Sequence, residues 1–161
     1  MRERSGLWSG LVSSLHIAPS AEVPTEAVAR VTAVRGRGLE GDRYFASAGT
    51  FSETPGSGRD VTLIEHETFE ALRLEGILVA PGDMRRNVVT RGVALNHLVG
   101  AEFRVGNVVL RGTRLCEPCA HLARLTRSEL LPALVHRGGL RADILEGGVI
   151  EVGDAVTPVE G

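Results

Sequence analysis

The sequence is poor in cysteine, in aromatic residues and in net charge. Only two cysteines, Cys116 and Cys119, occur among 161 residues, and aromatic residues make up 4% of the chain. A disulfide between two cysteines three residues apart would close a loop too small to stabilise the fold, which excludes a disulfide framework. Thiol chemistry or metal binding in a reducing compartment is the better interpretation, and we expect the chain to be cytoplasmic.

Large basic patches and long apolar runs are also missing. With 18 basic and 20 acidic residues the net charge is -2, which argues against a nucleic-acid-binding module that depends on bulk positive charge. No segment approaches the roughly 20 apolar residues that a membrane span needs. The N-terminal run MRERSGLWSGLVSSL is short, is broken by glycine and serine and has no small-residue cleavage site, so we expect a strand here and not a signal peptide.

What remains is the composition of an ordinary globular chain, 43% hydrophobic, whose 20 glycines separate short β-branched runs. Its length predicts one domain over residues 1–161, large enough to bury roughly two-thirds of its unfolded surface. We predict strands in residues 10–18, 27–34, 59–64 and 87–90, a hairpin in 102–115 that turns at Gly106-Asn107, and two or three strands in 138–158 separated by Gly147-Gly148 and Gly153-Asp154. Helical segments are predicted in residues 65–76, 95–98 and 121–135. In the first strand, alternation puts Leu11, Ser13 and Leu15 on one face and Val12, Ser14 and His16 on the other.

Short strands with few helices and little βαβ alternation favour a mixed α/β, β-rich fold with a mostly antiparallel, barrel-like core. A thioredoxin fold is therefore not expected, although CEPC resembles a dithiol motif.

Both cysteines fall in residues 108–125, VVLRGTRLCEPCAHLARL, where a strand pattern changes to a helical one. A thiol at a helix N-terminus has a lowered pKa, and Pro118 suits the first helical turn. The polar neighbours Glu117 and His121 favour Cys119 as the reactive thiolate. For Cys116, a buried core residue is an equally good interpretation.

Two further stretches could hold an anion. Arg85, Arg86 and Arg91 flank the strand predicted for residues 87–90, and arginine forks bind phosphate or carboxylate; the alternative is a solvated face paired with acidic residues. Residues 35–45 are glycine-rich, with a possible turn at Gly41-Asp42, so that backbone could approach a ligand; the alternative is a flexible connection that continues through residues 46–58.

Taken in order, these stretches resemble the MOSC family, named for the C-terminal domain of molybdenum cofactor sulfurase. The matching pieces span most of residues 38–156 and read GLEGDRYF, RDVTLIE, PGDMRRNVVTRGVALNHLVG, EFRVGNVVLRGTRLCEPCAHL and GGLRADILEGGVIEVGDAV. The resemblance implies a β-barrel like that of pyruvate kinase and an essential cysteine at Cys119. Members are thought to carry sulfur on this cysteine as a persulfide, or to bind molybdenum cofactor with the thiolate on the metal.

The resemblance also implies a site. Cys119 and Cys116 would be the catalytic residues, with Cys119 as the molybdenum ligand. The expected cofactor-binding residues are Arg85, Arg86 and Asn87 at the pterin's phosphate and polar edge, Asp42 and Arg59 at the mouth, and Asn96 and His121 nearby. If the chain is an enzyme, it is a cofactor-dependent oxidoreductase, for example on N-hydroxylated compounds, or a sulfurtransferase. The expected partners are a pyridoxal-phosphate-dependent cysteine desulfurase or a molybdenum cofactor enzyme.

Two hypotheses without thiol catalysis remain open. Cys116, Cys119 and His121 could form a structural zinc site, which would need a fourth ligand. Alternatively the arginines form a module that binds a small anion, in which case Cys119→Ser leaves the affinity for the anion unchanged.

Overall fold

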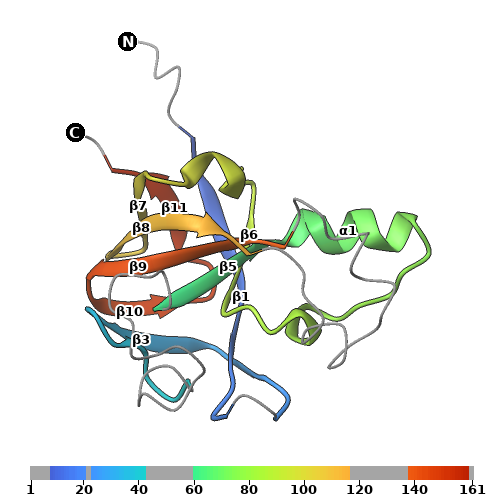
Figure 1. Ribbon diagram of the computed structural model, residues 1–161, viewed down its shortest axis with the longest axis horizontal. Coiled ribbons are helices and arrows are strands. Elements are labelled where there is room, and N and C mark those ends of the chain that lie inside the picture. The colour runs from blue at the N-terminus through green and yellow to red at the C-terminus, as the bar shows by residue number, and fades with distance from the viewer. Residues whose placement is uncertain (1–7, 21–22, 43–59, 117–137, 160–161) are drawn as a thin grey trace.

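A closed barrel of seven strands forms the centre of the structure. The computed structural model describes residues 8–20, 23–42, 60–116 and 138–159 (Figure 1). In order around the barrel, the strands are β1 (Gly10–Ile17), β11 (Ala155–Pro158), β7 (Glu102–Val105), β8 (Val108–Leu115), β9 (Leu140–Glu146), β5 (Val61–Glu65) and β6 (Val88–Arg91), which returns to β1. Every neighbouring pair is antiparallel except β5–β6. The predicted β-rich mixed fold with a mostly antiparallel barrel is confirmed.

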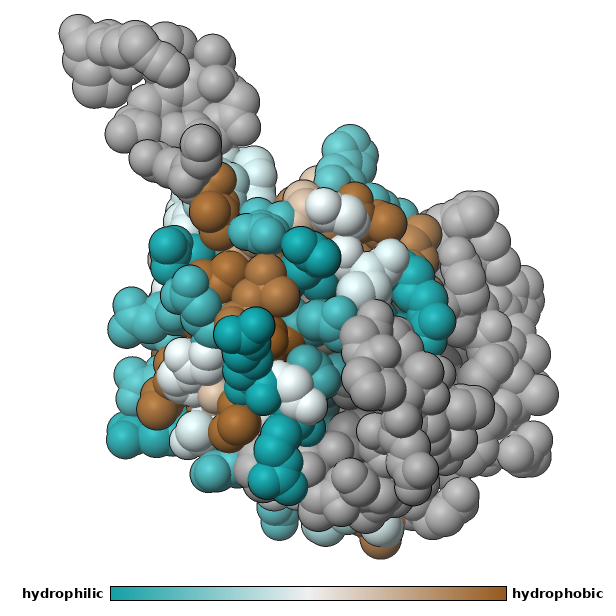
Figure 2. Space-filling view, turned by 60° about the vertical axis from the view of Figure 1, so that its left-hand side comes forward, coloured by the Kyte–Doolittle hydropathy of each residue, from teal (hydrophilic) through white to brown (hydrophobic). Residues whose placement is uncertain are grey.

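Alternating side chains fill the barrel interior. On β7, Phe103 and Val105 are buried while Glu102 and Arg104 are exposed, and the same alternation continues along β9. The predicted β7–β8 hairpin is present, because Val105 pairs with Val108 across Gly106, whose φ is 61°. Figure 2 shows one face of the molecule, on which polar side chains lie between apolar ones. The apolar set therefore points inward, as expected for a barrel filled by side chains.

The first strand does not alternate as predicted. Val12 and Leu15 are both buried in the core, whereas Leu11 is 41% exposed. The reason is a β-bulge: β1 pairs Val12 with Thr90 and Ser14 with Val89, so that one extra residue, Ser13, stands against no partner on β6. A bulge shifts the facing pattern by one residue.

The strand predicted for residues 27–34 is two strands in different sheets. β2 (Glu26–Val28) pairs with β1, while β3 (Arg30–Val34) lies between β10 (Gly148–Glu151) and β4 (Gly38–Leu39) in a second, three-stranded sheet. The chain changes sheets at Ala29, whose carbonyl accepts the N–H of Val152. Val31, Ala33 and Ile150 belong to the same core cluster as the barrel residues, so the small sheet packs on the barrel core.

The parallel strands β5 and β6 are joined through α1 (His66–Leu74) and the 3₁₀ helix η1 (Pro81–Met84); a second 3₁₀ helix, η2 (Leu95–Leu98), follows β6. Figure 1 shows α1 outside the barrel. Its Phe69 and Leu72 form a separate apolar cluster with Ile64, Met84 and Val89, so α1 covers the outer side of β5 and β6. None of the helices in the described ranges combines the length and the apolar character that crossing a membrane requires.

Candidate functional site

The structure describes six of the nine predicted site residues. Arg59, Cys119 and His121 lie outside the described residues, so the roles predicted for them stay predictions. The six described residues are Asp42, Arg85, Arg86, Asn87, Asn96 and Cys116.

Arg86 and Cys116 are held by two consecutive carbonyl groups. Arg86 lies between η1 and β6 and is only 9% exposed; its Nε donates to the carbonyl of Gly138 at 2.7 Å. The next carbonyl, that of Gly139, accepts the N–H of Cys116 at 2.8 Å. The buried guanidinium and Cys116, the residue that follows β8, therefore lie against the same dipeptide.

Glycine is required at the second position of this dipeptide. Gly139 has a φ of 107°, and a Cβ built on it would lie 2.1 Å from the carbonyl oxygen of Leu63 on β5. The chain thus passes close against β5 before it enters β9, where Leu140 pairs with both Leu63 and Leu115. This close approach fixes the carbonyls that hold Arg86 and Cys116.

Arg85 is bound differently from Arg86. Its backbone has a φ of 61°, in the left-handed region that side chains other than glycine rarely adopt. Its guanidinium donates to the carbonyls of Ser20 and Val23, in the segment that connects β1 and β2. Arg85 therefore anchors that connection.

Asn87 joins three strands of the barrel. Its Oδ1 accepts the N–H and the hydroxyl of Thr62 on β5, at 3.0 and 3.2 Å, and its Nδ2 donates to the carbonyl of His16 on β1, at 3.1 Å. Its side chain is buried. These contacts are structural, and a role of Asn87 toward a ligand stays a prediction.

Asp42 belongs to the same end of the barrel, whereas Asn96 does not. Asp42 is buried, and its Oδ1 accepts the N–H of Ala18, two residues beyond the His16 that Asn87 binds. Asn96 is exposed on η2. The neighbouring N–H of Leu95 donates to Glu65 at the C-terminal end of β5, so Asn96 lies at the other end of the β5–β6 pair.

The prediction from sequence missed Thr62, Gly138 and Gly139. A threonine in the apolar run VTLI and a glycine pair before a strand were the only signals of their roles. Neither signal indicates which residue is the hydrogen-bond partner, because the partners lie far away in sequence.

Burial shifts the pKa of two titratable groups near the described part of the site. Burial lowers the pKa of His16, whose Nε2 lies 2.8 Å from the hydroxyl of Ser14. Burial also raises the pKa of Asp60, although the N–H of Ile144, which donates to its Oδ2, opposes this shift.

The described residues contain no group of three or more metal-ligating side chains. Since two of the three predicted zinc ligands lie outside the described residues, the zinc hypothesis stays a prediction.

Comparison with known proteins decides the family. The sequence model of the MOSC domain matches residues 52–157. The chain belongs to the MOSC domain family. Among solved structures, this MOSC domain is similar to the YuaD protein from Bacillus subtilis, at 18% identity and a TM-score of 0.77, over 96% of this chain and 98% of that one.

Two further solved structures share the fold. YiiM from Geobacillus stearothermophilus matches at 17% identity and a TM-score of 0.71, over 94% of this chain and 75% of its own. YiiM from Escherichia coli matches at 18% identity and a TM-score of 0.63, over 92% and 70%. No curated protein sequence matches the chain significantly. At these identities the structural likeness establishes the fold alone.

The described part of this MOSC domain fits an anionic group. Nε of Arg86 is bound, but among the described residues no acceptor is found for its two Nη groups, although the residue is nine-tenths buried. An anionic oxygen that accepts from both Nη groups would give this guanidinium, which has no acidic partner among the described residues, a charge-assisted pair of hydrogen bonds. A phosphate or a phosphate-bearing cofactor such as molybdenum cofactor has the charge and the acceptor geometry that this guanidinium needs.

Proposed function

We propose that this MOSC domain binds molybdenum cofactor at the barrel end formed by Arg86, Gly138 and Gly139, with Cys119 as the thiolate that reaches the metal. The observation that carries the proposal is the Arg86 guanidinium, which is nine-tenths buried and lies beside the end of β8, and whose Nη groups have no acceptor among the described residues. A cation held next to the cysteine-bearing segment suits both an anionic cofactor and a thiolate.

The residues of the chain have separate tasks in this proposal. Arg86 binds the phosphate through its Nη groups while the Gly138 carbonyl fixes its Nε. The bond from Cys116 N–H to Gly139 fixes the end of β8, three residues before Cys119. Arg85, Asn87 and Asp42 hold the surrounding backbone. When bound, the cofactor would supply two-electron redox chemistry, such as the reduction of N-hydroxylated compounds.

Carriage of sulfur by Cys119 is the second use that the same arrangement supports. A persulfide is anionic and would be stabilised by the cation that Arg86 provides. In this case a cysteine desulfurase is the donor partner and a molybdenum cofactor enzyme the acceptor. The two uses share the site and differ in what the purified chain holds.

Native mass spectrometry with elemental analysis separates them. The wild-type chain is purified from a molybdenum-replete host beside Cys119→Ser, Cys116→Ser and Arg86→Gln, with Arg104→Gln as an exposed control on β7. Cofactor mass on the wild type and on Arg104→Gln, lost in Cys119→Ser and Arg86→Gln, would support cofactor binding. A labile addition of about 32 Da, one sulfur atom, lost only with Cys119 would support carriage of sulfur.

Other outcomes contradict the proposal. One zinc per chain, lost in both Cys116→Ser and Cys119→Ser, would show a structural metal site. An anion retained by Cys119→Ser but lost in Arg86→Gln would show an anion-binding module without thiol chemistry. Cofactor retained by Arg86→Gln would remove the observation on which the proposal rests.

A further inference from the structure

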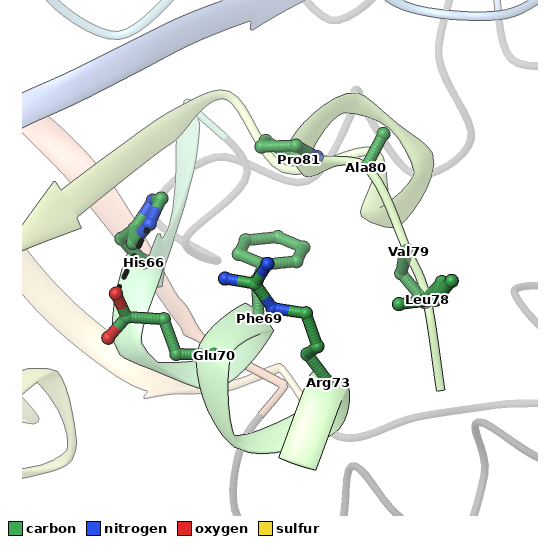
Figure 3. Close-up of a pocket in the computed structure, with 8 residues that line it drawn as sticks. All are labelled: His66, Phe69, Glu70, Arg73, Leu78, Val79, Ala80 and Pro81. Atoms are coloured by element: carbon green, nitrogen blue, oxygen red, sulfur yellow. Dashed lines mark ion pairs between the residues drawn. The ribbon is translucent and has the colours of Figure 1, made fainter. Parts of the chain in front are cut away.

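A pocket of about 410 Å³ lies between α1 and the segment that follows it, and neither Arg86 nor Cys116 lines it. It forms because α1 ends in a tight turn: the N–H of Ile77 donates to the carbonyl of Leu72, and that of Gly76, with a φ of 85°, to Arg73. This is the pattern in which glycine reverses the chain after a helix. The following segment therefore runs back beside α1 towards η1, and Figure 3 shows the pocket between them.

One part of the pocket is apolar. Phe69 lies at its centre, and Leu78, Val79 and Pro81 form the wall opposite α1 (Figure 3). Phe69 is 8% exposed and packs inward on the α1 cluster, but Leu78 is 67% exposed. An apolar body bound between Leu78 and Phe69 would remove part of this exposed leucine from water.

The two charged side chains of the pocket, Glu70 and Arg73, differ in their partners among the described residues. Glu70, its one acidic side chain, lies 3.8 Å from Nε2 of His66 and 3.6 Å from Arg91. His66 is further positioned by Ser13, the bulge residue of β1, whose hydroxyl lies 3.5 Å from its Nδ1. Arg73 has no acidic partner among the described residues, and its side chain turns back towards the pocket in Figure 3. Within the part of the chain that the structure describes, the exposed guanidinium of Arg73 is therefore not engaged by a carboxylate.

We propose that this pocket is a binding site for a small organic carboxylate with an apolar body. The body packs on Phe69 and Leu78, and the carboxylate is bound by the guanidinium of Arg73, which suits two-pronged binding of two oxygens. An amine is disfavoured because Glu70 already lies 3.6 Å from the guanidinium of Arg91 and 3.8 Å from the imidazole of His66. The volume lies in the range of roughly 300–1,000 Å³ typical of small-molecule sites, which favours a small ligand over a protein segment.

The test is an NMR titration of the ¹⁵N-labelled full chain with 2-naphthoate as the probe. The expected result is saturable shifts of the amides of residues 66–79. Arg73→Gln should weaken binding about tenfold or more, since it removes a charged hydrogen bond. Leu78→Ser should weaken it as well. Arg104→Gln, an exposed arginine of β7, and Arg86→Gln should bind like the wild type, which makes the result independent of the cofactor proposal.

Three results would overturn the proposal. The first is equal affinity for the neutral analogue 2-naphthamide, which would show that Arg73 does not select the charge. The second is the absence of shifts in residues 66–79 at millimolar probe. The third is wild-type affinity in Arg73→Gln, with Arg73→Lys measured beside it and folding of both checked by thermal melting.

Discussion

Replacing Gly139 by alanine tests the junction that holds Arg86 and Cys116. Alanine at a φ of 107° adopts a strained backbone, which costs about 1–2 kcal/mol, and its Cβ would lie 2.1 Å from the carbonyl oxygen of Leu63, which adds about 1–3 kcal/mol of overpacking. The expected loss in the free energy of unfolding is thus about 2–5 kcal/mol. For a domain of this length it corresponds to a fall in Tm of roughly 5–20 °C.

Two other glycines separate these two costs. Gly36 has a φ of 72° but no atom within 4 Å of its built Cβ, so Gly36→Ala shows the backbone strain alone. Gly112 has no such φ, yet its Cβ would lie 2.1 Å from the carbonyl oxygen of Leu98, so Gly112→Ala shows the crowding alone. In thermal and urea denaturation, the loss in Gly139→Ala should therefore exceed each of the other two.

The same variant should also loosen Cys116, because Gly139 accepts its N–H. In a Cys119→Ser background Cys116 is the one thiol left in the chain, and it is 2% exposed. Its reaction with a thiol reagent should be slow there and should accelerate when Gly139→Ala is added, but not when Gly36→Ala is added. A Gly139→Ala chain that melts with Gly36→Ala and keeps Cys116 unreactive would refute the account of this junction.

Three other predictions concern charge and backbone strain. Burial raises the pKa of Glu65, so the ionisation of this carboxyl opposes folding above that pKa. Glu65→Gln can still accept the N–H of Leu95 and should therefore raise the Tm at pH 7. This gain in Tm should vanish as the pH falls below about 4, where the carboxyl is protonated in both states. Burial lowers the pKa of His16, so the free energy of unfolding of the wild-type chain should fall as the pH drops below about 6.5, the pKa of histidine in the unfolded chain. Urea titrations at a series of pH values should show a smaller fall for His16→Gln. Both Arg85→Ala and Arg85→Gly lose the hydrogen bonds to the carbonyls of Ser20 and Val23. Alanine keeps the backbone strain at a φ of 61°, whereas glycine relieves it. Arg85→Ala should therefore be less stable than Arg85→Gly by about 1 kcal/mol in urea denaturation.

Local signals in the sequence were enough for several elements of the fold. The turn residues Gly106-Asn107 between two β-branched runs predicted the β7–β8 hairpin, and the change from an apolar run to helical spacing predicted the step from β5 to α1. Each of these signals depends on neighbours in sequence. For that reason each could be read without knowing the rest of the chain.

Pairings between distant segments could not be read in this way. The bulge at Ser13 exists because β1 must match β6, and the break at Ala29 exists because β2 and β3 join different sheets. The barrel closes only when β11 returns to β1, more than a hundred residues along the chain. Alternation within one strand carries no information on which strand lies beside it.

The two adjacent arginines show the same limit at the candidate site. In the sequence Arg85 and Arg86 carry one signal, a pair of cations before a strand, and both were assigned to the same anion. In the structure the left-handed backbone at Arg85 directs its side chain to the β1–β2 connection, whereas Arg86 points to Gly138 and the end of the cysteine-bearing strand. The carbonyls that engage Arg85 belong to residues more than sixty positions away. A motif of two arginines can therefore indicate an anion site, but only the backbone conformation between them decides where each guanidinium points.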